Sequence, residues 1–455
     1  MDTDRDIPNK IRDSFNDSLA KGYIHLYHTV DHHLVQHDPV GFPQLGNIVP
    51  QLSDKPQVPP STPDLSTRRL KDPLQGPHYG RGEHVLDLVH EPSGAQYAIV
   101  HNLHALAPEH CLVVPCFDPD GEGPHVFRPQ TSALTEADLW TAWRVVKAYA
   151  DEGRETTAFF NGGPLAGASQ PHLHIQFIPF QHTRAPGPEH LARSLAPVVS
   201  ANKPGAQQPG PVPARLPVPW VDFYLPLPFS GEGEGEAARS SSSNGPTSTT
   251  TTSPSSSPSS SPTSQPSPDL STLTPSALHR TYLSLLASRD ALIASHLVAD
   301  PDPAVRARVR VPSEDGGRRK SHNVFLTSRH LHVVPRRERL VVVPRGGGGK
   351  KAKAASEKAA AEDEQDEHDK DDQAADPDAD PSDASFAISL NGLVYLGYWA
   401  ASSESDWADL CKLGLAQVLT RAGYENDEFC GGGREGRGEG EGEGEGEGEG
   451  EGERR

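Results

Sequence analysis

Cysteine and long apolar runs are both scarce in this sequence of 455 residues. The 4 cysteines include no Cys-x-x-Cys pair, which argues against a disulfide scaffold and against a thiolate zinc site. No apolar run approaches the ~20 residues that a membrane-spanning helix needs, and the first residues lack the apolar segment of a signal peptide. We therefore expect a protein of the cytoplasm, with the nucleus as the alternative, and no membrane partner.

Basic residues are fewer than acidic ones, 42 lysines and arginines against 62 aspartates and glutamates, so the formal net charge is −20. Residues 362–383 hold 12 acidic residues against Lys370, and residues 434–455 hold 9 glutamates against 4 arginines. Acidic blocks of this kind are usually solvated. The rest of the chain is closer to neutral and offers no basic footprint for nucleic acid, so we expect no nucleic-acid partner.

Glycine (42) and proline (44) are in excess and gather in low-complexity tracts. Three tracts are predicted to be disordered: a Ser/Thr/Pro linker at 230–272, an acidic insert at 346–384 and a Gly-Glu tail at 431–455. They divide the chain into an N-terminal catalytic lobe, 1–229, with its core at about 80–182, and a C-terminal lobe, 273–430.

Apolar periodicity predicts both helices and strands. Helices are expected at about 9–21, from the N-cap Thr135 to Ala150, from Pro275 onward, and at about 405–421. Strand patterns cover residues 84–90, 97–101, 111–115, 156–160, 172–178, 323–327, 331–334 and 340–343. The Pro-rich residues 39–64 are expected to be irregular. This mixture predicts an α+β fold in which an antiparallel sheet is favoured over a doubly wound one.

The most informative pattern is His-x-His-x-Gln at residues 172–176. On a strand, His172, His174 and Gln176 share one face, and the apolar residues between them share the other. Desolvating three polar side chains without partners costs several kcal/mol in total, on the order of 2 or more for each group. An aligned imidazole pair can present one ring nitrogen as a nucleophile while its neighbours fix the tautomer.

A loop of small residues leads directly into this pattern. Gly162, Gly163 and Gly167, with Ser169, would let backbone N–H groups approach an anion closely, as in phosphate cradles. Two other interpretations stay open for the histidine pair: a zinc-ligand arrangement without an evident third ligand, and histidines that are satisfied structurally without any chemistry. Phosphate chemistry is favoured over both.

The segment resembles the histidine-triad superfamily, in the branch with His-x-His-x-Gln, and more specifically the fungal diadenosine tetraphosphate (Ap4A) phosphorylases, also called ATP adenylyltransferases. The motifs that carry the resemblance are Gly-Ala-Ser-Gln-Pro-His at 167–172, Asn102 with the LAPEH of 106–110, the RLPxP of 215–219, Asn323–Thr327 with the VVPR of 333–336, and the LNGL of 390–393. The resemblance implies a histidine-triad-like antiparallel sheet with flanking helices, extended by a C-terminal α+β lobe.

It also implies a mechanism. His174 would attack the α-phosphorus of Ap4A, release ATP and form an AMP–histidine, from which inorganic phosphate would release ADP. His172 would orient His174, and Gln176 would hydrogen-bond the phosphate. Substrate-binding roles would fall to Asn161, Gly162, Gly163, Ser169, Gln170, Asn102, Arg336 and Asn391. No covalent cofactor and no protein-bound metal are expected, although Mg²⁺ commonly accompanies a nucleotide polyphosphate. Oligomeric state is left open.

One departure from the family pattern concerns positive charge. Where the family has Asn-Lys-Phe, this chain has Asn102, Leu103 and His104, so a lysine is missing. Arg68, Arg69 and Lys71 could supply charge, or form a solvated cluster. The alternatives to the phosphorylase are a histidine-triad hydrolase of dinucleoside polyphosphates or nucleoside phosphoramidates, and a nucleotide-binding scaffold without turnover. A hexose-1-phosphate uridylyltransferase is disfavoured, because Leu173 stands where a proline is expected between the histidines.

Overall fold

The computed structural model describes residues 4–37, 42–52, 74, 82–116, 128–180, 187–189, 192, 213–229, 269–299, 320–345 and 385–427. The acidic insert and the Gly-Glu tail lie outside these residues, as does the predicted linker except for its last four positions. Arg68, Arg69 and Lys71 also lie outside them. Among the described helices, none has the length and apolar character that crossing a membrane requires.

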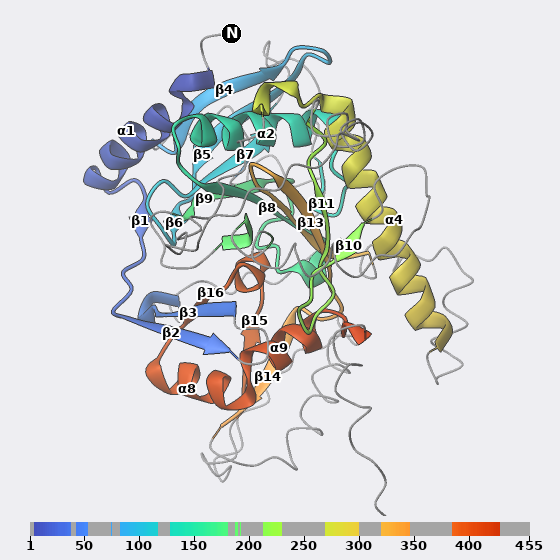
Figure 1. Ribbon diagram of the computed structural model, residues 1–455. Helices are drawn as coiled ribbons and strands as arrows, with labels where there is room; N and C mark the ends of the chain where they lie inside the picture. The colour runs from blue at the N-terminus through green and yellow to red at the C-terminus, as the bar shows by residue number, and fades with distance from the viewer. Residues whose placement is uncertain are drawn as a thin grey trace, which may run out of the picture.

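A nine-stranded sheet, antiparallel throughout, is the centre of the molecule (Figure 1). Its strands, in spatial order, are β10 (Ala214–Arg215), β11 (Phe223–Pro226), β13 (His330–Pro335), β12 (His322–Leu326), β8 (Thr156–Gly162), β9 (Ile175–Pro179), β7 (Cys111–Pro115), β5 (Ala95–His101) and β4 (His84–His90). The two halves of the sequence meet where β8 pairs with β12, with Asn161 opposite Asn323. The predicted α+β class with an antiparallel sheet is confirmed.

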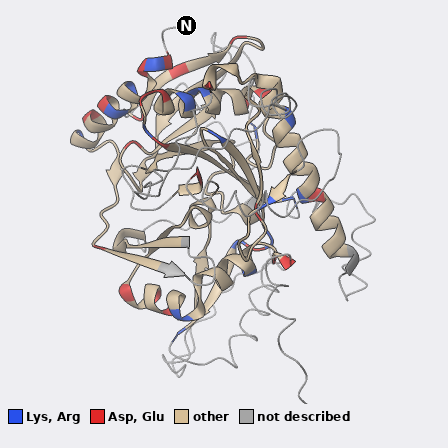
Figure 2. Ribbon diagram, viewed as in Figure 1, with Lys and Arg blue, Asp and Glu red and all other residues tan. Residues whose placement is uncertain are grey.

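Three helices cover one face of this sheet: α1 (Ile7–Ala20), α2 (Glu136–Asp151) and α4 (Pro275–Ala299). The α2 helix begins with the predicted cap, since Thr135 and Asp138 bond each other's backbone in a capping box. Its Trp143 is fully buried in the core that these helices share with the sheet. Figure 2 shows charged residues gathered on α1 and α2, whereas the strands of the large sheet are mostly uncharged. Both faces of the sheet carry buried apolar side chains, and the three helices cover one of these faces.

Elements from both ends of the chain pack in a second core, to which the other face of the sheet contributes Phe159 and Phe325. They are β2 (Asp31–His37), β3 (Phe42–Ile48), β14 (Leu340–Pro344), β15 (Ser385–Ser389), the 3-10 helix η8 (Gly392–Leu396), β16 (Tyr398–Ala401), α8 (Glu404–Leu413) and α9 (Leu415–Ala422). The strand β3 runs parallel to β16 and antiparallel to β2. Short elements complete the described chain: η1 (Asp4–Asp6), β1 (His25–Leu26), η2 (Pro50–Leu52), β6 (His104–Ala105), η4 (Pro164–Ala166) and η6 (Leu270–Thr272).

Two sequence predictions need correction. Residues 39–64 are not irregular throughout, because β3 lies within them and packs so closely on α8 that a Cβ at Gly46 would come 2.3 Å from Trp407 Cζ2. The helix expected at 405–421 is two helices. Gly414 separates α8 from α9 with φ +93°, a conformation that favours glycine.

Candidate functional site

The His-x-His-x-Gln segment enters the sheet later than the sequence predicts. The regular strand β9 begins at Ile175, and His172 forms only an isolated bridge with Pro129. Leu173, Ile175 and Phe177 nevertheless lie together in the core beneath the helices, so the predicted alternation of faces is confirmed for the apolar residues. The side chains of His172 and His174 are buried, with 1% and 2% of their surface exposed.

The ring of His174 has a defined tautomer. Its Nδ1 lies 2.8 Å from the backbone oxygen of His172, and a carbonyl oxygen can only accept a hydrogen bond. The proton of the neutral ring therefore lies on Nδ1, and Nε2 carries the lone pair. This is the arrangement that a nucleophilic imidazole requires, because attack through Nε2 leaves the developing positive charge next to an acceptor.

Gln176 is oriented by His110, a buried residue to which the sequence analysis assigned no role. The backbone N–H of Leu106 donates to His110 Nδ1 at 3.3 Å, so the ring proton lies on Nε2. That nitrogen is 3.1 Å from Gln176 Oε1, so it donates to the glutamine oxygen. Asn102 Nδ2, which is itself a donor, lies 3.1 Å from the same nitrogen, and in this tautomer the two make a close contact without a hydrogen bond. With its oxygen directed to His110, the half-buried Gln176 amide is left with its NH₂ group as a donor for a substrate.

The turn before His110 holds an unusual backbone conformation. Glu109 has φ +61°, the one described non-glycine residue with positive φ, and its side chain is buried. Arg154 and the hydroxyl of Tyr149 both donate to Glu109 Oε2, at 2.6 and 2.8 Å. Burial raises the pKa of Tyr149, so its hydroxyl keeps the proton that it donates. This ion pair holds the turn that aims His110 at Gln176. In the sequence, the LAPEH motif at 106–110 marks this turn and its histidine.

Asn161 lies on β8 at the junction of the two halves, and its side-chain oxygen is committed to the protein. It accepts hydrogen bonds from Asn323 Nδ2 at 2.8 Å and from the backbone N–H of Gly392 at 3.1 Å. Asn323 also donates to the carbonyl of Ala166 at 3.0 Å. The residue that the sequence predicts to hold phosphate is therefore the point where the small-residue loop, β12 and the LNGL segment meet.

Arg336 and Asn391 support the same junction. The Arg336 guanidinium is fully buried and donates to Asn323 Oδ1 at 2.8 Å and to the carbonyls of Glu338 and Leu390 at 3.0 Å each. Asn391 caps η8, since its side chain accepts the Leu393 N–H at 3.0 Å. These contacts favour a structural role for Arg336, and direct contact of either residue with a nucleotide stays a prediction.

The glycines of the small-residue loop allow close packing and positive φ angles. Gly163 and Gly167 have φ +95° and +81°, and a Cβ at Gly167 would come 2.3 Å from the carbonyl oxygen of Leu390. The N–H of Gly163 donates to the backbone oxygen of Gln130 at 3.2 Å. Gly162 is buried, Gln170 is half-buried and Ser169 is exposed, so the loop becomes accessible only toward its end.

Leu103, which replaces the family's lysine, is 43% exposed in the turn beside Asn102.

Among the described residues, one group could hold a metal ion: Asp31 and His33 on β2 with Glu404 at the start of α8. The group does not include the histidines of the His-x-His-x-Gln segment. The zinc interpretation of that segment therefore gains no third ligand from the part of the chain that the structure describes.

Comparison with known proteins gives two family matches in sequence order. Residues 96–193 match the Ap4A phosphorylase N-terminal domain, and residues 270–425 match the ATP adenylyltransferase C-terminal domain. Protein APA1 of Saccharomyces cerevisiae is 28% identical over 204 residues, which is 42% of this chain and 57% of the relative. Diadenosine 5',5'''-P1,P4-tetraphosphate phosphorylase 2 of the same yeast is 28% identical over 203 residues, 41% of this chain and 56% of the relative. The matched segment thus spans little more than half of these relatives.

Solved structures are similar over a longer range. The structure of yeast Ap4A phosphorylase Apa2 in complex with AMP has a TM-score of 0.55 at 17% identity, and the complex with Ap4A has 0.54 at 18%. Each comparison covers 92% of this chain and 97% of the solved chain. At this level of identity the similarity shows a shared fold.

Proposed function

Because this chain belongs to the Ap4A phosphorylase family, we propose that it is a nucleotidyltransferase that converts Ap4A and inorganic phosphate to ATP and ADP. The observation that carries the proposal is the tautomer of His174. Its Nδ1 donates to the His172 carbonyl, which leaves the lone pair on Nε2 in a segment fixed between the sheet and the small-residue loop.

The reaction has two displacements. In the first, Nε2 of His174 forms a bond to an α-phosphorus of Ap4A, the bond from that phosphorus to the bridging oxygen breaks, and ATP leaves. In the second, an oxygen of inorganic phosphate attacks the same phosphorus, the P–N bond breaks, and ADP leaves with the imidazole restored. Through both steps the Nδ1 proton stays hydrogen-bonded to the carbonyl of His172, which stabilises the positive charge on the phosphorylated ring.

Gln176 explains how phosphate could be preferred over water. Its amide oxygen is directed to His110, so its NH₂ group can bond an oxygen of the α-phosphate. An amide neither takes up nor releases a proton near neutral pH, so it gives no general base for an attacking water. Inorganic phosphate is already an anionic nucleophile and needs no such base. We further propose that Mg²⁺ enters with the polyphosphate.

The test is isolation of the covalent intermediate. Ap4A labelled at the α-phosphates is incubated with the full chain, and the protein is recovered under denaturing conditions. We expect an acid-labile, base-stable adenylyl label, and inorganic phosphate added before denaturation should chase this label into ADP. His174→Ala should lose the label and lower turnover by at least about 10³-fold, whereas His84→Ala, a change at a partly exposed histidine on β4, should keep both.

Two results would contradict the proposal. Release of AMP without added phosphate would identify a hydrolase. Binding of Ap4A with neither label nor product would identify a non-catalytic scaffold.

A further inference from the structure

A short segment outside the predicted site lies alongside the histidine pair. We call Arg128–Gln130 the clasp. The N–H of Leu173 donates to the carbonyl of Arg128 at 2.7 Å, and the N–H of Gln130 donates to the carbonyl of Pro171 at 2.7 Å. Between these bonds Pro129 bridges His172. The clasp therefore acts as a two-bond antiparallel partner for residues 171–173, just before β9 begins.

At His174, the next residue, the side chain of Gln130 binds the backbone in place of the clasp's own backbone groups. Its Oε1 accepts the N–H of His174 at 2.8 Å, and its Nε2 donates to the carbonyl of His174 at 3.2 Å and to that of Asn161 at 3.1 Å. Gln130 is 3% exposed, and its own carbonyl accepts the N–H of Gly163. A single amide thus binds both backbone groups of His174 and ties them to the end of β8.

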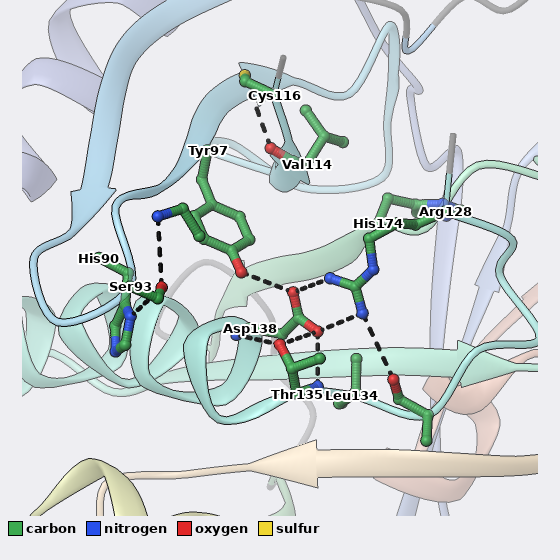
Figure 3. Close-up of polar contacts among 12 residues, drawn as sticks. His90, Ser93, Tyr97, Val114, Cys116, Arg128, Leu134, Thr135, Asp138 and His174 are labelled. Atoms are coloured by element: carbon green, nitrogen blue, oxygen red, sulfur yellow. Dashed lines mark hydrogen bonds and ion pairs between the residues drawn. The ribbon is translucent and has the colours of Figure 1, made fainter. Parts of the chain in front are cut away.

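The clasp is anchored to α2 through Arg128 (Figure 3). Its guanidinium makes two bonds to Asp138, at 2.5 and 2.7 Å, and the Asp138 side chain is fully buried. Asp138 also accepts from the Tyr97 hydroxyl at 2.8 Å and from the N–H of Thr135 at 2.7 Å. Burial raises the pKa of Tyr97, so the phenol remains a donor. A paired charge with this many partners holds the clasp in one place.

We propose that Gln130 is a positioning residue for the nucleophile: it fixes the backbone of His174 so that Nε2 stands in line with the α-phosphorus. The inference rests on the proposed function. His174 lies just before the regular strand β9, and there the side-chain amide of Gln130 binds both its backbone N–H and its carbonyl. Gln130 supplies those bonds and shares them with Asn161 and Gly163, which sets the nucleophile and the loop beside it at one fixed separation. Misplacement of a reacting atom by about 1 Å can cost about 10²-fold in rate.

The experiment compares three variants of the full chain. Gln130→Leu removes all three side-chain bonds, and Gln130→Glu keeps the acceptor for the His174 N–H but loses both donors. Gln44→Leu is the matched control, because Gln44 is also 3% exposed and its Oε1 accepts from Trp399 Nε1 in the second core. For each variant we measure the single-turnover rate of adenylyl label formation, kcat and KM for Ap4A, and the thermal unfolding midpoint.

We expect label formation and kcat to fall about 100-fold in Gln130→Leu and about 10-fold in Gln130→Glu, with KM within about twofold of wild type. Gln44→Leu should keep its rate, although its midpoint falls. If Gln130→Leu does not fold, Gln130→Glu decides the question.

The inference is overturned if the folded Gln130 variants keep kcat within about twofold of wild type, or if KM rises while kcat holds. Wild-type protein that forms no label overturns the proposed function instead, so the two failures are distinguishable.

Discussion

Two histidines of the site carry their protons on opposite ring nitrogens, and a backbone group determines each choice. The carbonyl of His172 places the proton of His174 on Nδ1, whereas the N–H of Leu106 places that of His110 on Nε2. The first ring can therefore act as a nucleophile through Nε2, and the second can only donate from Nε2. The sequence shows His172, His174 and Gln176 in one motif, but neither that His110 contacts them nor which neighbour of each ring accepts and which donates.

Changing His110 to phenylalanine should release the amide of Gln176 to rotate. We expect kcat for Ap4A phosphorolysis to fall about 5-fold, since one hydrogen bond contributes roughly 1 kcal/mol. The fraction of product released as AMP should rise slightly, because the rotated amide oxygen can orient an attacking water by accepting a hydrogen bond from it, although it takes up no proton. His90→Phe is the control: His90 is also buried, on β4, and bonds Ser93. Equal effects of both changes on the ratio of AMP to ADP would refute this role for His110.

At the scale of elements, apolar spacing predicted α1, α2, α4 and most strands of the large sheet within a few residues. It failed where a distant element decides the local structure. Residues 42–48 form β3, which pairs along its whole length with the preceding β2 and, over Leu45–Ile48, with β16, more than 350 residues later. Gly414 ends α8, although apolar residues continue at helical spacing beyond it. The strand predicted from His172 begins three residues late, because the clasp rather than a neighbouring strand pairs with its first residues.

The docking of α1 onto β5 gives a prediction about pH. His101 Nε2 lies 3.0 Å from Ser14 Oγ, and its ring packs edge-on against Phe15. Burial lowers the pKa of His101 to about 4 from 6.5, so between these values the unfolded chain binds a proton that the folded chain does not. The free energy of unfolding should therefore fall as the pH drops through this range, with about 2 kcal/mol of the loss at pH 5 due to His101.

Urea unfolding at pH 7 and pH 5 measures this contribution. His101→Gln should remove about 2 kcal/mol of the difference between the two pH values, and His84→Gln should leave the difference as it is. A pH dependence that His101→Gln does not change would place the acid sensitivity elsewhere.

At the scale of the whole molecule, the two halves of the sequence are parts of one sheet. The pairing of β8 with β12 is reinforced by Asn161, Asn323 and Arg336, so the C-terminal half contributes part of the wall of the site. The sequence predicted two lobes from a change in composition, and it also supplied the motifs of both halves. Which strand of one half would pair with which strand of the other could not be predicted, because spacing within a segment contains no information about a partner 160 residues away.

This arrangement predicts the outcome of cutting the chain between the halves. A specific protease site placed at about residue 248, in the low-complexity tract, should yield two fragments that elute together and keep Ap4A phosphorolysis. The N-terminal fragment would retain β8 and β11, whose partners β12 and β13 lie in the other fragment. Native and denaturing size-exclusion chromatography measure the association. Fragments that separate without denaturant would contradict the continuous sheet.

The central strand pair also has a consequence for synthesis on the ribosome. The partner of Asn161, Asn323, is synthesised 162 residues later. At about 5–20 residues per second, that interval is roughly 8 to 30 seconds. During it the open edge of β8 is available to other nascent chains, so the newly made N-terminal half is expected to depend on chaperones until translation passes β12.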